Sequence, residues 1–130
     1  MDKSSILKAF NNHLVELLED VKGLFPSDIN IKTALKMVGM LKKANPKMII
    51  KGWKSYVSDR YKNEISKGDF EFFLNKNYQN DVNDVEDAGQ VLQTIQLIKD
   101  KFQQMNEENR GKTIKYVQNL TKLCDLYFSN

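Results

Sequence analysis

The sequence has one cysteine and one histidine among its 130 residues. Cys124 alone cannot form a disulfide within the chain, which fits a reducing compartment. His13 and Cys124 are also too few to assemble a His/Cys metal cluster. We therefore expect no disulfide framework and no zinc site. His13 is expected to be a boundary side chain, and Cys124 a small buried apolar one.

Long apolar runs and sequence signatures of catalysis are missing as well. No stretch of about 18 apolar residues occurs, and the first residues lack the apolar segment of a signal peptide. The Walker A, G-x-G-x-x-G and H-E-x-x-H patterns are absent, and no nucleophile signature surrounds His13 or Cys124. We expect an intracellular protein that is not an enzyme, with no cofactor, no membrane partner and no small-molecule substrate.

One cluster of acidic residues is a candidate for carboxylate chemistry or for a Ca²⁺ site. It comprises Asp81, Asp84, Glu86 and Asp87. An EF-hand loop requires glycine at its sixth position and glutamate at its twelfth, and neither register fits. We interpret the cluster as the solvated start of a helix, where negative charge suits the helix dipole.

Charge is distributed unevenly along the chain. Residues 36–62 carry eight Lys or Arg and one Asp, a net charge of +7, whereas residues 63–108 carry four Lys and ten acids, a net charge of −6. Such a pattern can indicate a charged binding surface. It can equally indicate two segments that neutralise each other once folded, and the sequence leaves both interpretations open.

Apolar residues recur at spacings of three and four, which predicts an all-α compact bundle of about five to six helices in a single domain, residues 1–130. The first helix is expected to be capped by Ser4 or Ser5, with an apolar stripe through Leu24, and to end before Pro26. The second follows the turn 27–30 and ends before Asn45. Met37 and Met40 could line a peptide groove, but they sit at core spacing, so we expect them to broaden the buried face of this second helix.

The third predicted helix, residues 46–62, is expected to be central to the fold. Asn45 can cap it and Pro46 can be its first residue. Its buried face is expected to comprise Ile49, Ile50, Trp53, Tyr56, Val57 and Tyr61. Beyond the break at residues 66–69, we expect a short helix to residue 74, a polar loop over 75–84, a helix from 84 to 105, a connection over 106–111 and a final helix.

Basic residues on and beside the third helix form the candidate nucleic-acid or partner-binding site. They are Lys43, Lys47, Lys51, Lys54, Arg60 and Lys62. A stripe of this kind can follow a phosphate backbone without reading its sequence. It can also simply keep a helical protein soluble. Lysine outnumbers arginine eighteen to two, which weakens the nucleic-acid interpretation because arginine makes the bidentate phosphate contacts.

Several motifs resemble small uncharacterised proteins encoded by giant (nucleocytoplasmic large) DNA viruses that replicate in protists and algae. They are Phe25-Pro26, the run Leu-Lys-Lys-Ala-Asn-Pro-Lys-Met-Ile-Ile-Lys at 41–51, Tyr-Lys-Asn-Glu-Ile at 61–65, and Gly-Asp-Phe-Glu-Phe-Phe-Leu-Asn-Lys at 68–76. The resemblance covers roughly residues 10–80 and implies no activity and no site residues. It implies a location in the host cytoplasm, the viral factory or the virion.

Two functions follow as expectations from the absence of catalytic signatures and the surplus of apolar positions. The first is a non-enzymatic protein-interaction module, as a minor structural component of the virion or viral factory, with a protein partner or self-association. The alternative is a sequence-independent DNA- or RNA-binding protein that uses the basic face of the 46–62 helix.

Overall fold

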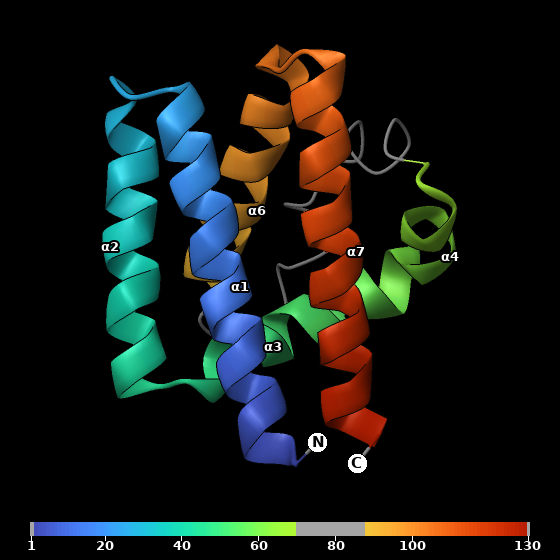
Figure 1. Ribbon diagram of the computed structural model, residues 1–130. Coiled ribbons are helices and arrows are strands. Elements are labelled where there is room, and N and C mark those ends of the chain that lie inside the picture. Colours follow the sequence, from blue (N-terminus) through green and yellow to red (C-terminus); the bar gives the residue numbers. More distant parts are fainter. Residues whose placement is uncertain (1, 70–87, 130) are drawn as a thin grey trace.

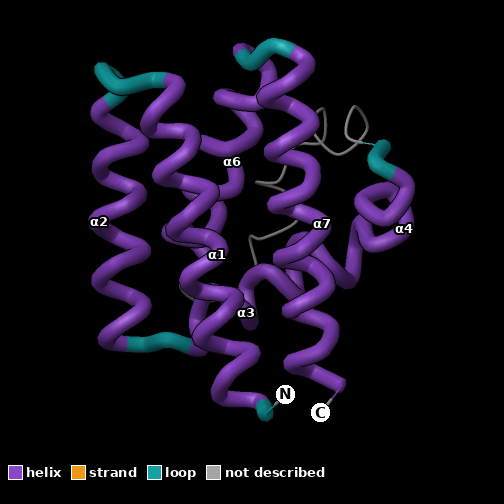
Figure 2. Tube along the Cα trace, viewed as in Figure 1, coloured by secondary structure: helices purple, strands orange, loops and turns teal. Residues whose placement is uncertain are grey.

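The computed structural model describes residues 2–69 and 88–129 of the chain, and every regular element in these ranges is helical. Figure 1 shows the long helices α1, α2, α6 and α7 running side by side, with the shorter α3 and α4 crossing and flanking them, and Figure 2 shows the short loops at the ends of α1, α2 and α6. The elements are α1 (Lys3–Leu24), α2 (Ile29–Ala44), α3 (Lys47–Trp53), η1 (Lys54–Ser58), α4 (Asp59–Lys67), α6 (Ala88–Gln104) and α7 (Glu107–Ser129). The prediction of an all-α bundle is confirmed.

Helix α1 packs between α2 and α7 and supplies much of the core. The predicted cap at Ser4 or Ser5 is wrong, because the carboxylate of Asp2 accepts a hydrogen bond from the Ser5 amide at 2.7 Å and begins the helix earlier. The predicted stripe is buried at Phe10, Leu14, Leu17, Leu18 and Val21, whereas Leu24, at its end, is 41% exposed. The stripe is therefore confirmed except in its last turn.

Helix α2 begins at the residue after Asp28, whose carboxylate accepts hydrogen bonds from the amides of Asn30 and Ile31. Val38 is buried, but Met40 is 63% exposed. The prediction that Met40 faces the core is wrong. Residues two apart on an α-helix point about 200° apart, so Met40 lies on the side opposite Val38.

The segment predicted as one helix over 46–62 is helical from Lys47 onward, but it is not one regular α-helix. The predicted start is wrong, because Pro46 is the N-cap residue and Asn45 ends α2 instead. A π-helical turn, η1, follows α3, and the amide of Asp59 donates to the carbonyl of Lys54, five residues back. A second break lies at Tyr61, with φ −128° and ψ 18°. These two irregularities change the direction in which successive side chains leave the segment.

The predicted apolar face of this segment is nevertheless buried at every position: Ile49, Ile50, Trp53, Tyr56, Val57 and Tyr61. Its neighbours are α1, α2, α6 and α7, which the sequence did not identify. The Trp53 indole also makes an edge-to-face contact with Phe10, with ring centroids 5.9 Å apart. The predicted burial of this face is therefore confirmed, but the most extensive packing between helices is that of α1 with α7 and α2.

Helix α4 ends at Gly68, whose φ of +75° lies in the left-handed region that glycine adopts without strain. The predicted helix from Asp69 to residue 74, the polar loop over 75–84 and the acidic cluster over 81–87 lie outside the described residues. The predicted connection over 106–111 is wrong, because α7 begins at Glu107. The side chain of Asn106 accepts a hydrogen bond from the Asn109 amide at 2.9 Å and so caps it.

Candidate interaction surface

The structure divides the six predicted site residues among four elements. Lys43 lies in the last turn of α2, Lys47 and Lys51 lie in α3, Lys54 in η1, and Arg60 and Lys62 in α4. Arg60 is exposed, but its Nε donates to the carbonyl of Ser55 at 3.1 Å. Because η1 and the break at Tyr61 intervene, the six residues do not continue one α-helical stripe.

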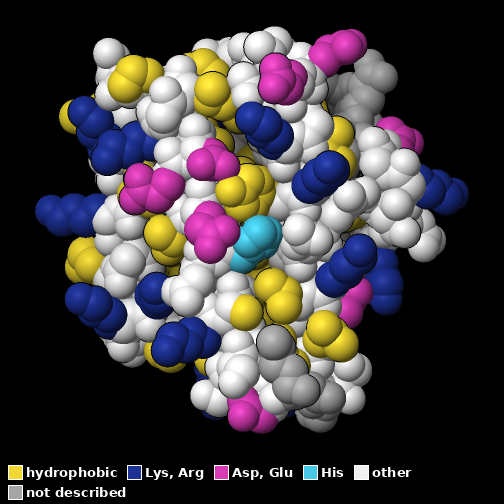
Figure 3. Space-filling view, in the orientation of Figure 1, with side chains coloured by type: hydrophobic (Ala, Val, Ile, Leu, Met, Phe, Trp, Pro, Cys, Tyr) yellow, Lys and Arg dark blue, Asp and Glu magenta, His cyan; other side chains and the backbone are white. Residues whose placement is uncertain are grey.

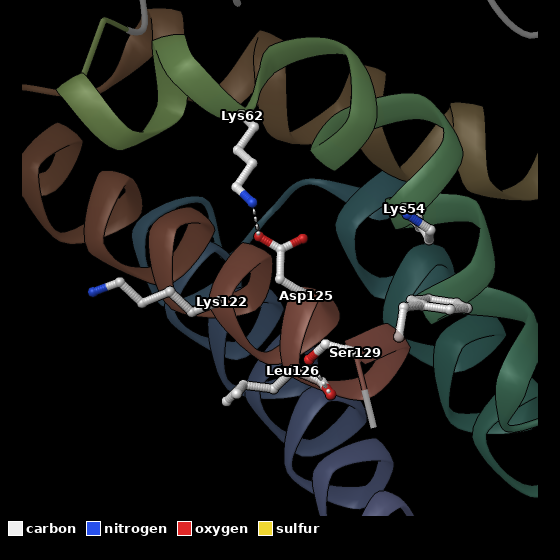
Figure 4. Close-up of a pocket in the computed structure, with 7 residues that line it drawn as sticks. Lys54, Lys62, Lys122, Asp125, Leu126 and Ser129 are labelled. Carbon is white, nitrogen blue, oxygen red and sulfur yellow. Dashed lines mark hydrogen bonds and ion pairs between the residues drawn. The ribbon is translucent and has the colours of Figure 1, made fainter.

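Lys54 and Lys62, from the second half of the predicted stripe, are held by carboxylates. Lys54 Nζ lies 2.9 Å from Asp59 Oδ1, and this hydrogen bond raises the pKa of Lys54. Lys62 Nζ lies 3.2 Å from Asp125 Oδ2 on α7. Figure 4 shows Lys62 reaching Asp125 across a surface cavity of about 670 Å³. Lys54 therefore joins η1 to α4, and Lys62 joins α4 to α7.

The other three predicted lysines, Lys43, Lys47 and Lys51, are exposed, and so are Lys32 and Lys36 of α2. None of these five makes an ion pair with any residue that the structure describes. No acidic residue occurs between Asp28 and Asp59. Figure 3 shows basic side chains along the molecular edge over α2, separated from acidic side chains over α1. We call this set the α2–α3 lysines: Lys32, Lys36, Lys43, Lys47 and Lys51.

The side of α2 that faces away from the core combines lysines with exposed apolar side chains. Ile29 is 73% exposed and Met40 63%, the highest values for large hydrophobic residues in the described part of the chain. They are eleven residues apart, about three helical turns, so they share one side of α2. We call this side the outer face of α2, defined by Ile29, Lys32, Lys36, Met40 and Lys43.

A groove of about 470 Å³ runs beside this face, between α2 and α6. Ala34 and Met37 contribute apolar surface from α2, and Leu97 contributes it from α6. Polar side chains complete the lining: Asn30, Thr33, Gln93, Thr94, Gln96 and Asp100. Met37 is half-buried, so apolar surface continues from the groove toward Met40.

The single histidine belongs to a cluster that ties α1 to α7. His13 Nδ1 lies 3.3 Å from Glu16 Oε2, and the His13 ring lies 4.7 Å from the Tyr116 ring. The Tyr116 hydroxyl donates to Asp20 Oδ2 at 2.6 Å, and this bond raises the pKa of Tyr116 to about 12. The two Tyr116 contacts join α1 to α7, whereas the contact between His13 and Glu16 lies within α1.

Cys124 is buried, as predicted, and its thiol contacts the carbonyl of Ile50 at 3.6 Å. Burial raises the pKa of this thiol to about 12, far from that of a reactive cysteine. Among residues 2–69 and 88–129, no three His, Cys, Asp or Glu side chains are grouped so as to hold a metal ion. No helix in these ranges is long and apolar enough to cross a bilayer.

Comparison of the chain with protein-family models, with curated proteins and with solved structures finds no match.

The sequence allows a Met-lined peptide groove at Met37 and Met40 but favours core packing, and it does not identify the outer face of α2 as a site. A signal for this face is present, because Ile29 and Met40 lie opposite Val38 on a helical projection.

Proposed function

We propose that the protein is a non-enzymatic protein-interaction module that binds its partner through the outer face of α2. The observation that carries this proposal is the exposure of Ile29 and Met40 together on one side of one helix. Covering such side chains contributes on the order of 1–2 kcal/mol each. An apolar pair framed by charged residues is also the usual anatomy of a transient protein interface.

The charges on this face restrict the partner. The charged residues on the outer face of α2 are Lys32, Lys36 and Lys43, and α2 has no acidic residue. Two copies paired through this face would place lysine against lysine, which is destabilising. The proposed partner is therefore a protein surface with acidic residues around an apolar contact. Any self-association must use another face.

The cellular setting proposed for this module is the virion or viral factory of a giant DNA virus, in which it would be a minor structural component. The resemblance of residues 10–80 to proteins of such viruses supports this setting. Mass spectrometry of purified particles tests it. Peptides of this protein should be present at a constant ratio to the major capsid protein, and their absence would contradict a structural role.

Affinity capture from the cells that naturally make the protein tests the interaction itself. The wild-type chain is compared with Met40→Glu and with a control, Leu126→Glu, which changes a 50% exposed leucine on α7. A partner should be enriched by the wild type and by the control but lost with Met40→Glu. Equal recovery with all three chains would contradict a role for the outer face.

Nucleic-acid binding is the second candidate function. The observation that favours it is the set of five α2–α3 lysines without ion pairs to described residues, in a segment free of acids. Contacts to phosphates release counterions, so affinity for fluorescent DNA or RNA should fall steeply between about 50 and 200 mM salt. No binding at the lower salt concentration would eliminate this candidate.

A further inference from the structure

We infer that the segment that docks on the outer face of α2 is an acidic amphipathic α-helix. This inference rests on the proposed function and identifies the partner's chemistry. Three features of the surface carry it: two exposed apolar side chains, Ile29 and Met40, a groove beside them and three lysines on the same side of the helix.

The two exposed apolar side chains and the groove together fit the apolar edge of a helix. Ile29 and Met40 lie about 16 Å apart along the axis of α2 at 1.5 Å per residue, with Lys32, Thr33 and Lys36 between them on the same side. Met37 extends apolar surface from Met40 into the groove against α6. A groove that adjoins a ridge is the arrangement that receives a helix with anchors at every third or fourth residue. Methionine suits this role because its flexible side chain adapts to the incoming surface.

The lysines on this face match acidic residues spaced along a helix. Lys32 and Lys36 are about 6 Å apart along the axis of α2, and Lys36 and Lys43 are about 10.5 Å apart. A second helix packed alongside, with Glu or Asp four and then seven residues apart, would place a carboxylate near each lysine. The three lysines are exposed and make no ion pair with the described residues.

Other occupants use less of this surface. A nucleic-acid backbone would engage the lysines but would leave Ile29 and Met40 without apolar contacts. The acidic side chains of α1 in a second copy are a poorer match, because two of the three, Glu16 and Asp20, already contact His13 and Tyr116 within the same molecule and only Glu19 makes no such contact with the described residues. An acidic amphipathic helix satisfies both the apolar and the charged parts of the face.

A designed peptide tests this inference directly. The probe is a fluorescein-labelled peptide of about twenty residues, with leucines along one helical edge and glutamates placed to match Lys32, Lys36 and Lys43. Its control has the same composition, with the glutamates moved to the opposite side of the helix. A labelled DNA oligonucleotide of equal length is the third probe. Binding is measured by anisotropy in about 150 mM salt, where weak surface attraction is screened.

The wild-type protein should bind the matched peptide about tenfold more tightly than the control peptide, and the matched peptide should gain helical circular dichroism on binding. Lys36→Glu should weaken binding about tenfold and Met40→Ser about fivefold, because one removes a charge contact and the other an apolar contact. Lys122→Glu and Leu126→Ser are the matched controls on α7, and they should change affinity less than about twofold.

Equal binding of the two peptides, or equal binding by the α2 variants and the wild type, would overturn the inference. Tighter binding of DNA, lost with Lys36→Glu but kept with Met40→Ser, would also overturn it in favour of a polyanion. If affinity capture of a partner still depends on Met40, the proposed function stands even though the inference about an acidic helix fails. If the peptide test fails and capture does not depend on Met40, both proposals are contradicted.

Discussion

The indole nitrogen of Trp53 donates a hydrogen bond to the hydroxyl of Thr121, 3.1 Å away and 68 residues later in the chain. Both residues are buried. The bond joins α3 to α7 at the point where the central segment passes into its π-helical turn. Because a buried indole N–H requires an acceptor, this pair helps to determine which helix packs against α3.

Replacement of Thr121 by valine should destabilise the fold by about 1–3 kcal/mol, because it keeps the shape of the side chain and leaves the Trp53 N–H without its acceptor. Urea unfolding followed by the fluorescence of the single tryptophan measures this change. Thr121→Ser keeps the hydroxyl and is the control for its loss. A valine variant as stable as the wild type would show that the hydrogen bond contributes nothing.

The stability of the bundle should depend on the ionisation of Asp28. This carboxylate pairs with Lys101 of α6 and accepts two backbone hydrogen bonds at the start of α2, which together lower its pKa. A group whose pKa is lower in the folded state stabilises that state above its unfolded pKa of about 4 and loses this effect as pH falls through the folded value.

Asp28→Asn keeps a capping side chain but removes the charge. Its melting temperature should therefore lie below that of the wild type at pH 7, and the gap should narrow toward about pH 3. Asp100→Asn, an exposed change on α6, is the control and should show no such convergence. A gap that stays constant with pH would contradict the ion pair with Lys101.

The Cys124 thiol should be unreactive in the folded protein. It is buried, and its pKa is raised to about 12, so almost no thiolate exists at pH 8. A disulfide reagent such as Ellman's reagent should modify it only as fast as the protein opens, and rapidly in denaturant. Rapid modification of the native protein at pH 8 would show that α7 does not pack on α3 as described.

The lysines of the predicted stripe should not contribute equally if the protein binds nucleic acid. Lys51 is exposed and makes no ion pair with the described residues, whereas Lys62 pairs with Asp125. Lys51→Ala should weaken DNA binding and reduce the salt slope by about one unit. Lys62→Ala should have a smaller effect, and equal losses would show that the six predicted residues act as one surface.

Fold class and the buried faces of the helices were predictable because they follow from local periodicity. Phe10, Leu14 and Leu17 recur at helical spacing, and all three are buried. The same reasoning failed at Met40, where residue type was given more weight than helical position. It also failed at the start of α1, where the expected cap is Ser4 or Ser5 and the observed cap is Asp2.

Features that depend on contacts between distant residues could not be predicted. The π-helical turn η1 and the break at Tyr61 occur where Ser58 donates to Asp125 Oδ1 at 2.6 Å, a partner 67 residues away. Asn11 is buried and donates to the carbonyl of Pro46 at 3.0 Å, a contact that has no local signature. The irregular backbone at η1 and Tyr61 divides the predicted lysine stripe in the structure.

The proposed binding surface is the outer face of α2. Photocrosslinking tests it most directly, with a benzophenone amino acid placed at position 40 and, as the control, at position 126 on α7. Both positions are exposed, so the two variants should fold alike. We expect a specific protein adduct from position 40 alone, lost when Lys36 is changed to glutamate. Adducts from position 126 but not from position 40 would contradict the claim.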